Sequence, residues 1–103
     1  MSNILDVSKN FDEFISEGVV VIDFFATWCG PCKMLAPIID KIAGDMPQVK
    51  FGKVDVDQAM DLARRFGIRS IPTVIIFKDG VQVELVRGLQ DEEFLVETIS
   101  SHM

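Results

Sequence analysis

One run of apolar residues, from Val19 to Ala26, constrains the fold of this chain more than any other feature of its sequence. It is rich in β-branched and aromatic side chains, and both of its alternating sets of positions are apolar, interrupted only by Asp23. A strand that is apolar on both sides must be covered on both sides. The sequence therefore predicts a central strand in a sheet that has helices on each face.

Strand-like and helix-like segments alternate along the rest of the chain, in the order β-α-β-α-β-α-β-β-α. This order indicates an α/β fold that ends in an antiparallel hairpin. A length of 103 residues, 49% of them hydrophobic, suits one domain spanning residues 1–103 with a continuous core. The predicted strands cover residues 3–7, 19–26, 49–56, 73–78 and 81–87, and the predicted helices cover about 11–17, 34–44, 59–66 and 92–99.

Local signals mark the ends of several elements. Asn10, followed three residues later by Glu13, resembles a capping box that opens the first helix. Asp91 is a candidate N-cap of the last helix, whose Phe94, Leu95 and Ile99 are expected to face inward. Asp79 and Gly80 predict a two-residue hairpin turn.

The charge of the chain excludes some classes of partner. A net charge of −6 argues against DNA, RNA or an anionic membrane, which attract basic surfaces. The paired Arg64 and Arg65 fit a solvated helix face. The first residues mix charged and apolar side chains, unlike a secretory signal, and the longest apolar run is too short to span a bilayer. We therefore expect a cytoplasmic protein, and structural disulfides are rare in the cytosol.

Two cysteines, Cys29 and Cys32, follow the central strand directly and begin a helix. A helix N-terminus favours negative charge, so a thiol there ionises more easily. Pro31 fits the first turn of a helix, where amide hydrogens have no helical partner. The spacing lets the two sulfurs meet, which provides both an attacking and a resolving thiolate. The sequence thus predicts dithiol–disulfide exchange.

Two other interpretations of the cysteines are a place in the core and half of a zinc site. A zinc site needs four ligands, and this chain has no third cysteine and a single histidine, His102, in what is expected to be a frayed tail. A dimer that shares zinc would satisfy the ligand count, so this alternative stays open. Redox chemistry is the preferred interpretation, with no metal and no cofactor expected.

Residues 22–33, IDFFATWCGPCK, closely resemble the active-site signature of the thioredoxin family. The resemblance runs from about Phe11 to Ile99, without an obvious gap, and implies the thioredoxin fold, a central mixed sheet of about five strands flanked by about four helices. Further matching segments are Met34, Ala36 and Pro37, residues 53–57 (KVDVD), 66–69 (FGIR), 71–73 (IPT) and 77–80 (FKDG), and Gly88.

The resemblance assigns roles to four residues. Cys29 would be the exposed nucleophile that forms a mixed disulfide with a target protein, and the more buried Cys32 would resolve it. Asp23 interrupts an apolar strand, and from the residues alone it could either escape to solvent or be buried at a cost. Family members have a buried Asp here, which implies a raised pKa and a role as the general base for Cys32. Lys53 matches a family lysine near that Asp, although an ordinary exposed strand residue would look the same.

The resemblance also implies a docking surface for target proteins. An X–Pro bond is usually trans, but the family proline that matches Pro72 is cis and faces the cysteines. It limits metal binding and presents a backbone edge to the substrate. Trp28 next to a reactive thiol favours a partner-facing surface over the core. The implied substrate-binding residues are Trp28, Gly30, Pro31, Ile71, Pro72 and Gly88, with Leu89 as a further candidate.

These features favour a protein disulfide reductase, an electron carrier in cell redox homeostasis that a thioredoxin reductase would recycle and that acts on disulfide-containing proteins as a monomer. An oxidase or isomerase of the same fold would typically carry histidine between the cysteines, where this chain has Gly30 and Pro31. The CPYC-type pattern of glutaredoxins is absent. A binding module that uses the same surface without redox chemistry remains an alternative from another class.

Overall fold

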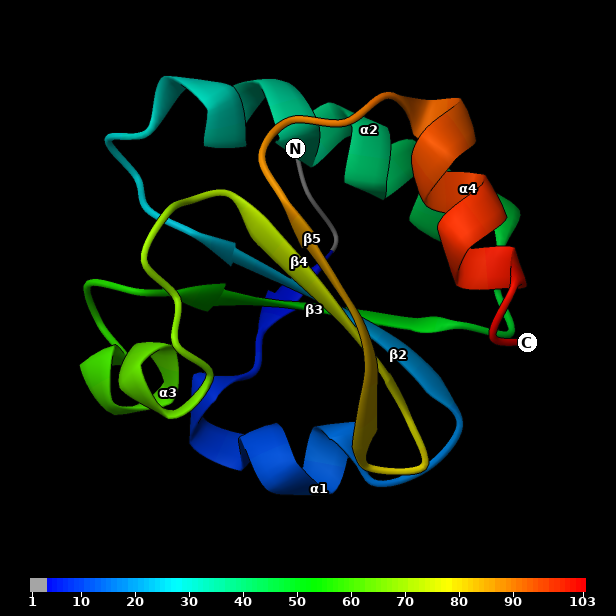
Figure 1. The fold of residues 1–103 in the computed structure, drawn as a ribbon, viewed down its shortest axis with the longest axis horizontal. Helices are drawn as coiled ribbons and strands as arrows, with labels where there is room; N and C mark the ends of the chain where they lie inside the picture. Colours follow the sequence, from blue (N-terminus) through cyan, green and yellow to red (C-terminus); the bar gives the residue numbers. More distant parts are fainter. Residues whose placement is uncertain (1–3) are drawn as a thin grey trace.

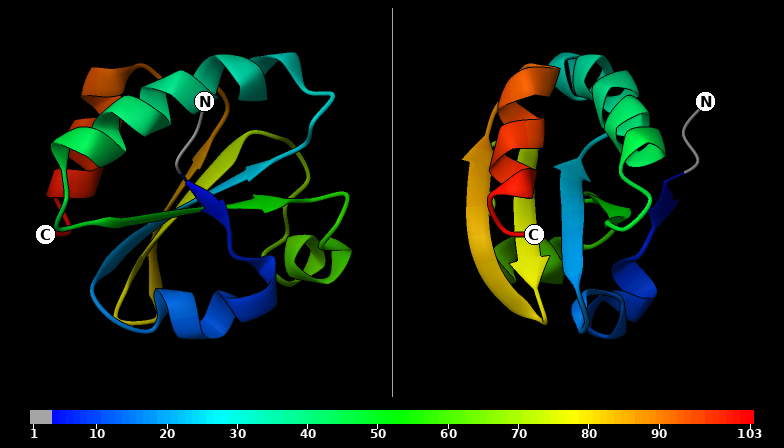
Figure 2. Two further views of the ribbon diagram at one scale, coloured as in Figure 1. Left: turned by 180° about the vertical axis from the view of Figure 1, so that it is seen from behind. Right: turned by 90° about the vertical axis from the view of Figure 1, so that its right-hand side faces the viewer.

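The computed structural model describes residues 4–103 and has a five-stranded sheet with helices on both faces (Figure 1). Helices α2 (Gly30–Asp45) and α4 (Glu92–Ser100) lie on one face, and α1 (Phe11–Ile15) and α3 (Met60–Arg65) lie on the other (Figures 1 and 2). The predicted α/β architecture is confirmed.

The sheet is mixed, with strand order β1-β3-β2-β4-β5. β2 (Val19–Phe25) is the central strand: it pairs with β3 (Lys50–Asp55) in parallel and with β4 (Thr73–Lys78) in antiparallel orientation. β4 continues into β5 (Val81–Arg87) as the predicted antiparallel hairpin. β1 (Leu5–Asp6) is shorter than predicted, and position 3 of that predicted strand lies outside the described residues.

The two faces of β2 belong to two separate cores, as its apolar pattern requires. Val21 points into the core beneath α2 and α4, together with Leu35, Ile39 and Ile99. The alternate residues of β2 point into the opposite core, which contains a cluster of four aromatic rings. These rings belong to Phe11, Phe24, Phe66 and Phe77. Because side chains alternate along a strand, Asp23 shares the face of Val21 and is directed toward α2.

Three local predictions fail. Asn10 precedes α1, but its side chain makes no capping hydrogen bond, because a short 3₁₀ turn (Ser8–Asn10) leads directly into the helix. Phe94 is 44% exposed, whereas Leu95 and Ile99 are buried as expected. His102 is not in a frayed tail: its Nε2 lies 2.9 Å from Glu84 Oε2.

The other predicted ends are confirmed or refined. Asp91 caps α4, because its Oδ1 accepts a hydrogen bond from the Phe94 amide at 2.9 Å. Asp79 and Gly80 both have positive φ angles, as a tight hairpin turn requires.

The two paired arginines are both solvent-exposed, as predicted. Arg65 in addition binds both oxygens of Asp12 and lies over the Phe11 and Phe66 rings. None of the helices described over residues 4–103 is long and apolar enough to cross a membrane.

Candidate active site

Cys29 and Cys32 lie where the central strand β2 gives way to helix α2. Cys29 is the N-cap of α2, and Pro31 lies in its first turn, where its missing N–H costs no helical bond. The two cysteines form a disulfide, with their Cα atoms 5.3 Å apart. The Cys32 amide donates a hydrogen bond to Cys29 Sγ at 3.1 Å. The helix N-terminus therefore points an N–H group at the first sulfur, where negative charge is stabilised.

The two cysteine residues are equally buried but line different cavities. Both cysteines are 4% exposed, so the expected contrast between an exposed Cys29 and a buried Cys32 is wrong for this disulfide form. Cys29 lines an open groove of about 550 Å³ that also contains Trp28, Pro31 and Ile71. Cys32 instead lines a partly open cavity of about 260 Å³ beside α2, together with Asp23, and we call this the inner cavity. The two cysteines therefore differ in the cavity that each of them lines and not in their exposed fraction.

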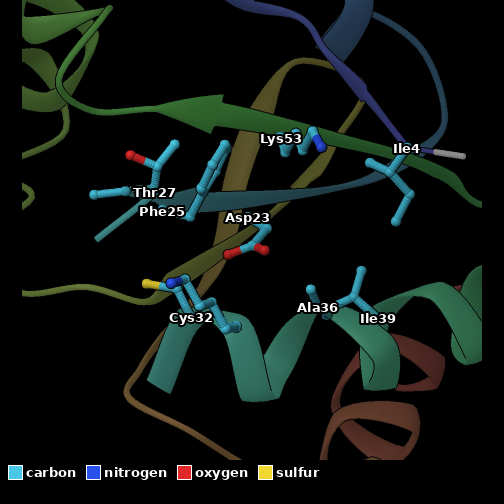
Figure 3. A pocket seen from close by; sticks show the side chains of 10 residues that line it. Ile4, Asp23, Phe25, Thr27, Cys32, Ala36, Ile39 and Lys53 are labelled. Atoms are coloured by element: carbon cyan, nitrogen blue, oxygen red, sulfur yellow. The ribbon is translucent and has the colours of Figure 1, made fainter. Parts of the chain in front are cut away.

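Asp23 is a carboxyl group inside an apolar environment. Its side chain points toward α2, where Cys32 and Ala36 project (Figure 3). The residue is 7% exposed, and among the described residues no group donates a hydrogen bond to its Oδ1. Burial raises the pKa of Asp23 to about 7, and the positive charge of Lys53 opposes part of that rise. Asp23 can therefore gain and lose a proton near neutral pH, beside one of the two cysteines.

Lys53 lies next to Asp23 on the adjacent strand of the sheet. The two residues are aligned in the parallel pairing of β2 and β3, and both line the inner cavity (Figure 3). Within residues 4–103 they form no ion pair, and Lys53 Nζ lies 5.5 Å from the centre of the Phe25 ring. Lys53 thus acts on Asp23 through its charge rather than through a hydrogen bond. It is not an ordinary exposed strand residue.

Trp28 forms an exposed wall of the groove. Its side chain is 68% exposed, so it is a surface residue and not part of the core. The indole Nε1 donates a hydrogen bond of 2.7 Å to Asp57 Oδ2. Sequence reasoning did not single out Asp57, because the two residues are 29 positions apart and no local pattern links them.

The loop before β4 forms another wall. The Ile71–Pro72 peptide bond is cis, which confirms the prediction. The Ile71 carbonyl oxygen lies 3.9 Å from Cys29 Sγ, so this loop faces the dithiol. The amide of Gly88 donates a 2.8 Å hydrogen bond to the Pro72 carbonyl, which links the end of β5 to this loop.

The structure brings together most of the predicted docking residues. Trp28, Gly30, Pro31 and Ile71 line the groove beside Cys29. Pro72 is buried, and Pro72, Gly88 and the 39% exposed Leu89 are not among the groove-lining residues. Sequence reasoning missed Arg69 and Ser70, which line the groove and could have been suspected because they directly precede Ile71.

The described residues offer no ligand set for a metal ion. Within residues 4–103, no three His, Cys, Asp or Glu side chains are grouped so that they could hold one. His102, the only histidine, contacts Glu84 on β5. The zinc interpretation of the cysteine pair therefore lacks further ligands within this part of one chain.

Comparisons with known proteins agree with this geometry. The family model described as Thioredoxin matches residues 3–101. Thioredoxin of Chlamydia pneumoniae is 50% identical over 95 residues, which cover 92% of this chain and 93% of that protein. Thioredoxin of Staphylococcus haemolyticus is 48% identical over 96 residues, with 92% of each chain covered.

Solved structures show the same similarity. A mutant thioredoxin from Halobacterium salinarum superposes with a TM-score of 0.89 at 40% identity, covering 96% of this chain and 88% of that one. Mitochondrial thioredoxin 3 from Saccharomyces cerevisiae, in its oxidised form, gives a TM-score of 0.88 at 35% identity, with 95% and 94% covered. With a family match over nearly its whole length and a redox-active cysteine pair at the end of its central strand, the chain belongs to the thioredoxin family of protein disulfide oxidoreductases.

Proposed function

We propose that this thiol–disulfide reductase works through a mixed disulfide at Cys29 that Cys32 resolves. The Cys29 thiolate attacks one sulfur of a target disulfide, forming a Cys29–target bond and releasing the other target sulfur as a thiol. The Cys32 thiolate then attacks Cys29 Sγ, which forms the Cys29–Cys32 disulfide and releases the second target thiol. Two electrons and two protons pass from the chain to the target.

The assignment rests on the observation that the two cysteines line different cavities. Cys29 lines the groove beside the exposed Trp28, where a target chain can dock, whereas Cys32 lines the inner cavity with the buried Asp23. An intermolecular attack needs access to the partner, and an intramolecular one needs only the neighbouring sulfur. This arrangement supports Cys29 as the attacking residue and Cys32 as the resolving residue.

Asp23 is proposed as the general base for Cys32. A base works best when its pKa lies near the working pH, and the pKa of about 7 at Asp23 meets that condition. Asp23 lines the same inner cavity as Cys32, and within residues 4–103 no hydrogen bond reaches its Oδ1, so the thiol proton would pass to it through one water molecule. Lys53 is proposed as a positioning residue, because its charge keeps the pKa of Asp23 from rising further.

Target proteins are proposed to dock on the groove and the loop beside it. Trp28, Gly30, Pro31 and Ile71 supply an apolar surface around Cys29, and Pro72 with Gly88 supports the loop that carries Ile71. Exposed aromatic and apolar side chains around a reactive atom are typical of a protein-binding surface. The proposed targets are disulfide-containing proteins.

Each reaction cycle leaves the chain oxidised, so a donor must return two electrons. We assign that step to a thioredoxin reductase and place the cycle in a reducing compartment, the cytoplasm, where protein disulfides are otherwise kept reduced. The chain is proposed to act as a single domain and as a monomer.

The experiment is the reduction of insulin disulfides with dithiothreitol as the electron source. We expect strong acceleration by the unaltered chain and none by Cys29→Ser. In Cys32→Ser, Cys29 should still attack a target disulfide, and the resulting mixed disulfide at Cys29 should accumulate and be detectable by intact-mass spectrometry. A mixed disulfide that forms on Cys32 in the Cys29→Ser chain, and not on Cys29 in the Cys32→Ser chain, would reverse the assignment.

The same assay tests Asp23. Asp23→Asn should slow the resolving step by about a hundredfold or more, the lower end of the range for general-base catalysis, and remove its pH dependence near neutrality. An unchanged rate and pH profile would contradict the role of Asp23. If Cys29→Ser binds targets with full affinity and the unaltered chain does not reduce them, a binding module without redox chemistry is the better description.

A further inference from the structure

We propose that Arg69 sets the target preference of this reductase, favouring disulfides that are flanked by acidic side chains. The inference rests on the proposed docking of targets in the Cys29 groove. It adds a charge preference to a surface that is otherwise apolar.

Arg69 is the one charged side chain among the described residues that line the groove. Apart from Ser70, its neighbours on the groove walls are apolar or glycine. A charged group at the edge of an apolar docking surface contributes to specificity and to the rate of encounter more than to affinity. The apolar residues would hold any unfolded segment around a disulfide, and Arg69 would discriminate among such segments.

None of the other described residues engages the guanidinium of Arg69. Arg69 is exposed, and within residues 4–103 its side chain makes no hydrogen bond, ion pair or ring contact. Arg65 and Lys41 behave differently: Arg65 binds Asp12 with two hydrogen bonds, and Lys41 contacts Asp45 and Glu92. The positive charge of Arg69 is therefore available to a bound partner.

Arg69 lines the same groove as Cys29 and is near it along the chain. Arg69 precedes Ile71 by two positions, and the Ile71 carbonyl oxygen lies 3.9 Å from Cys29 Sγ. Adjacent Cα atoms are about 3.8 Å apart, so the long arginine side chain can reach residues that flank a target cysteine held at Cys29. Arginine also binds carboxylates through two parallel hydrogen bonds, which suits Asp and Glu.

The remaining charges would favour the opposite preference if Arg69 had no effect. The chain carries a net charge of −6, and Asp57 lies at the Trp28 wall of the groove, where it accepts the indole hydrogen bond. These charges attract basic segments at long range. Arg69 and the overall charge therefore predict different orders of substrate preference, and this difference makes the proposal testable.

The experiment uses three synthetic peptides, each with one intramolecular disulfide flanked by Asp, Asn or Lys. Their reduction by the pre-reduced chain is followed in single turnovers by the fluorescence of Trp28, the only tryptophan. Each rate is divided by the rate of the same peptide with dithiothreitol alone, which removes differences in intrinsic reactivity. The chain variants are Arg69→Gln, Arg69→Glu and, as a charge-matched control, Lys78→Gln. Lys78 is exposed and lies at the end of β4 away from Thr73, the residue that follows Pro72.

We expect the unaltered chain to reduce the Asp peptide about twofold to fivefold faster than the Lys peptide, the range of an exposed ion pair. Arg69→Gln should abolish that ratio, Arg69→Glu should invert it, and Lys78→Gln should leave it unchanged. The preference should shrink as salt is raised from 0.05 to 0.5 M, because salt screens exposed charges.

The Asn peptide distinguishes a failure of the charge preference from a failure of the proposed reductase function. If all four chains reduce it at similar rates while the Asp-to-Lys ratio does not respond to Arg69→Glu, the preference is overturned and the reductase function stands. A faster reaction of the Lys peptide with the unaltered chain would also overturn it. Failure of the unaltered chain to reduce even the Asn peptide would overturn both proposals.

Discussion

At the scale of single residues, Asp23 shows how function can oppose stability. An apolar side chain at this position would pack against α2 without cost, whereas a carboxyl group must either remain protonated or be buried as a charge. The sequence makes Asp23 conspicuous because it interrupts an apolar strand. The structure places it on the face of β2 that packs against α2, in the same cavity as Cys32.

The pKa of Asp23 predicts that the folded chain loses stability as the pH rises. Below pH 4 the carboxyl group is protonated in both the folded and the unfolded chain. Between pH 4 and 7 it ionises in the unfolded chain, where its ordinary pKa is 3.8, while the folded chain keeps the proton because its pKa is about 7. The contribution of this group to the free energy of unfolding should therefore fall by roughly 4 kcal/mol across that window and level off above it.

Asp23→Asn should remove this slope and stabilise the chain above pH 7 by a similar amount. Urea unfolding of both chains between pH 4 and 8.5 measures the effect, and Asp61→Asn serves as the control, because Asp61 is exposed and forms no ion pair within residues 4–103. Parallel stability profiles for the unaltered chain and Asp23→Asn would show that Asp23 is not buried as described.

The site could be predicted from the sequence where its residues are neighbours, and not where it depends on distant contacts. Cys29, Cys32 and Pro31 lie within one turn, so their geometry follows from the start of a helix. The hydrogen bond between Trp28 and Asp57 joins residues 29 positions apart and has no local signature. The different cavities of the two cysteines also depend on the packing of the whole sheet.

At the scale of single elements, the two predicted N-caps show what a sequence signal can and cannot determine. Asp91 has an extended backbone (φ −79°, ψ 166°), the usual N-cap conformation, and its carboxylate accepts the Phe94 amide. Asn10 has the right side chain, but it is the last residue of the 3₁₀ turn, and its backbone angles, φ −133° and ψ 34°, are not those of that conformation. A capping residue functions only when the preceding chain arrives extended.

This contrast predicts different costs for two similar truncations. Asp91→Ala removes a capping hydrogen bond and should lower the free energy of unfolding by about 1 kcal/mol. Asn10→Ala removes no such bond and should change it by less than about 0.5 kcal/mol, as expected for an ordinary surface position. Urea unfolding at one pH measures both. Equal losses in the two variants would mean that Asn10 caps α1 in solution.

At the scale of the whole molecule, the fold holds the cysteine pair where the central strand of the sheet leads into helix α2. β2 is buried on both faces, and the short turn of residues 26–29 joins it to α2, so Cys29 is held between a strand and a helix that both pack into the cores. This arrangement follows from the pattern of the sequence, since a strand that is apolar on both sides must lie in the centre. The sheet order could not be derived from the pattern alone, because it depends on which strands pair across long separations.

A rigid junction predicts that oxidation changes stability much more than it changes structure. The disulfide closes the short loop from Cys29 to Cys32, and its Cα separation of 5.3 Å fits ordinary disulfide geometry. Loop-closure entropy in the unfolded chain then makes the oxidised form more stable by about 2 kcal/mol, which is equivalent to a melting temperature roughly 10 °C higher. Calorimetry of the chain with and without a phosphine reductant measures the difference. The double variant Cys29→Ser, Cys32→Ser should melt at one temperature under both conditions. A reduced form as stable as the oxidised one would mean that reduction relieves strain at the junction, contrary to a site held in place by both cores.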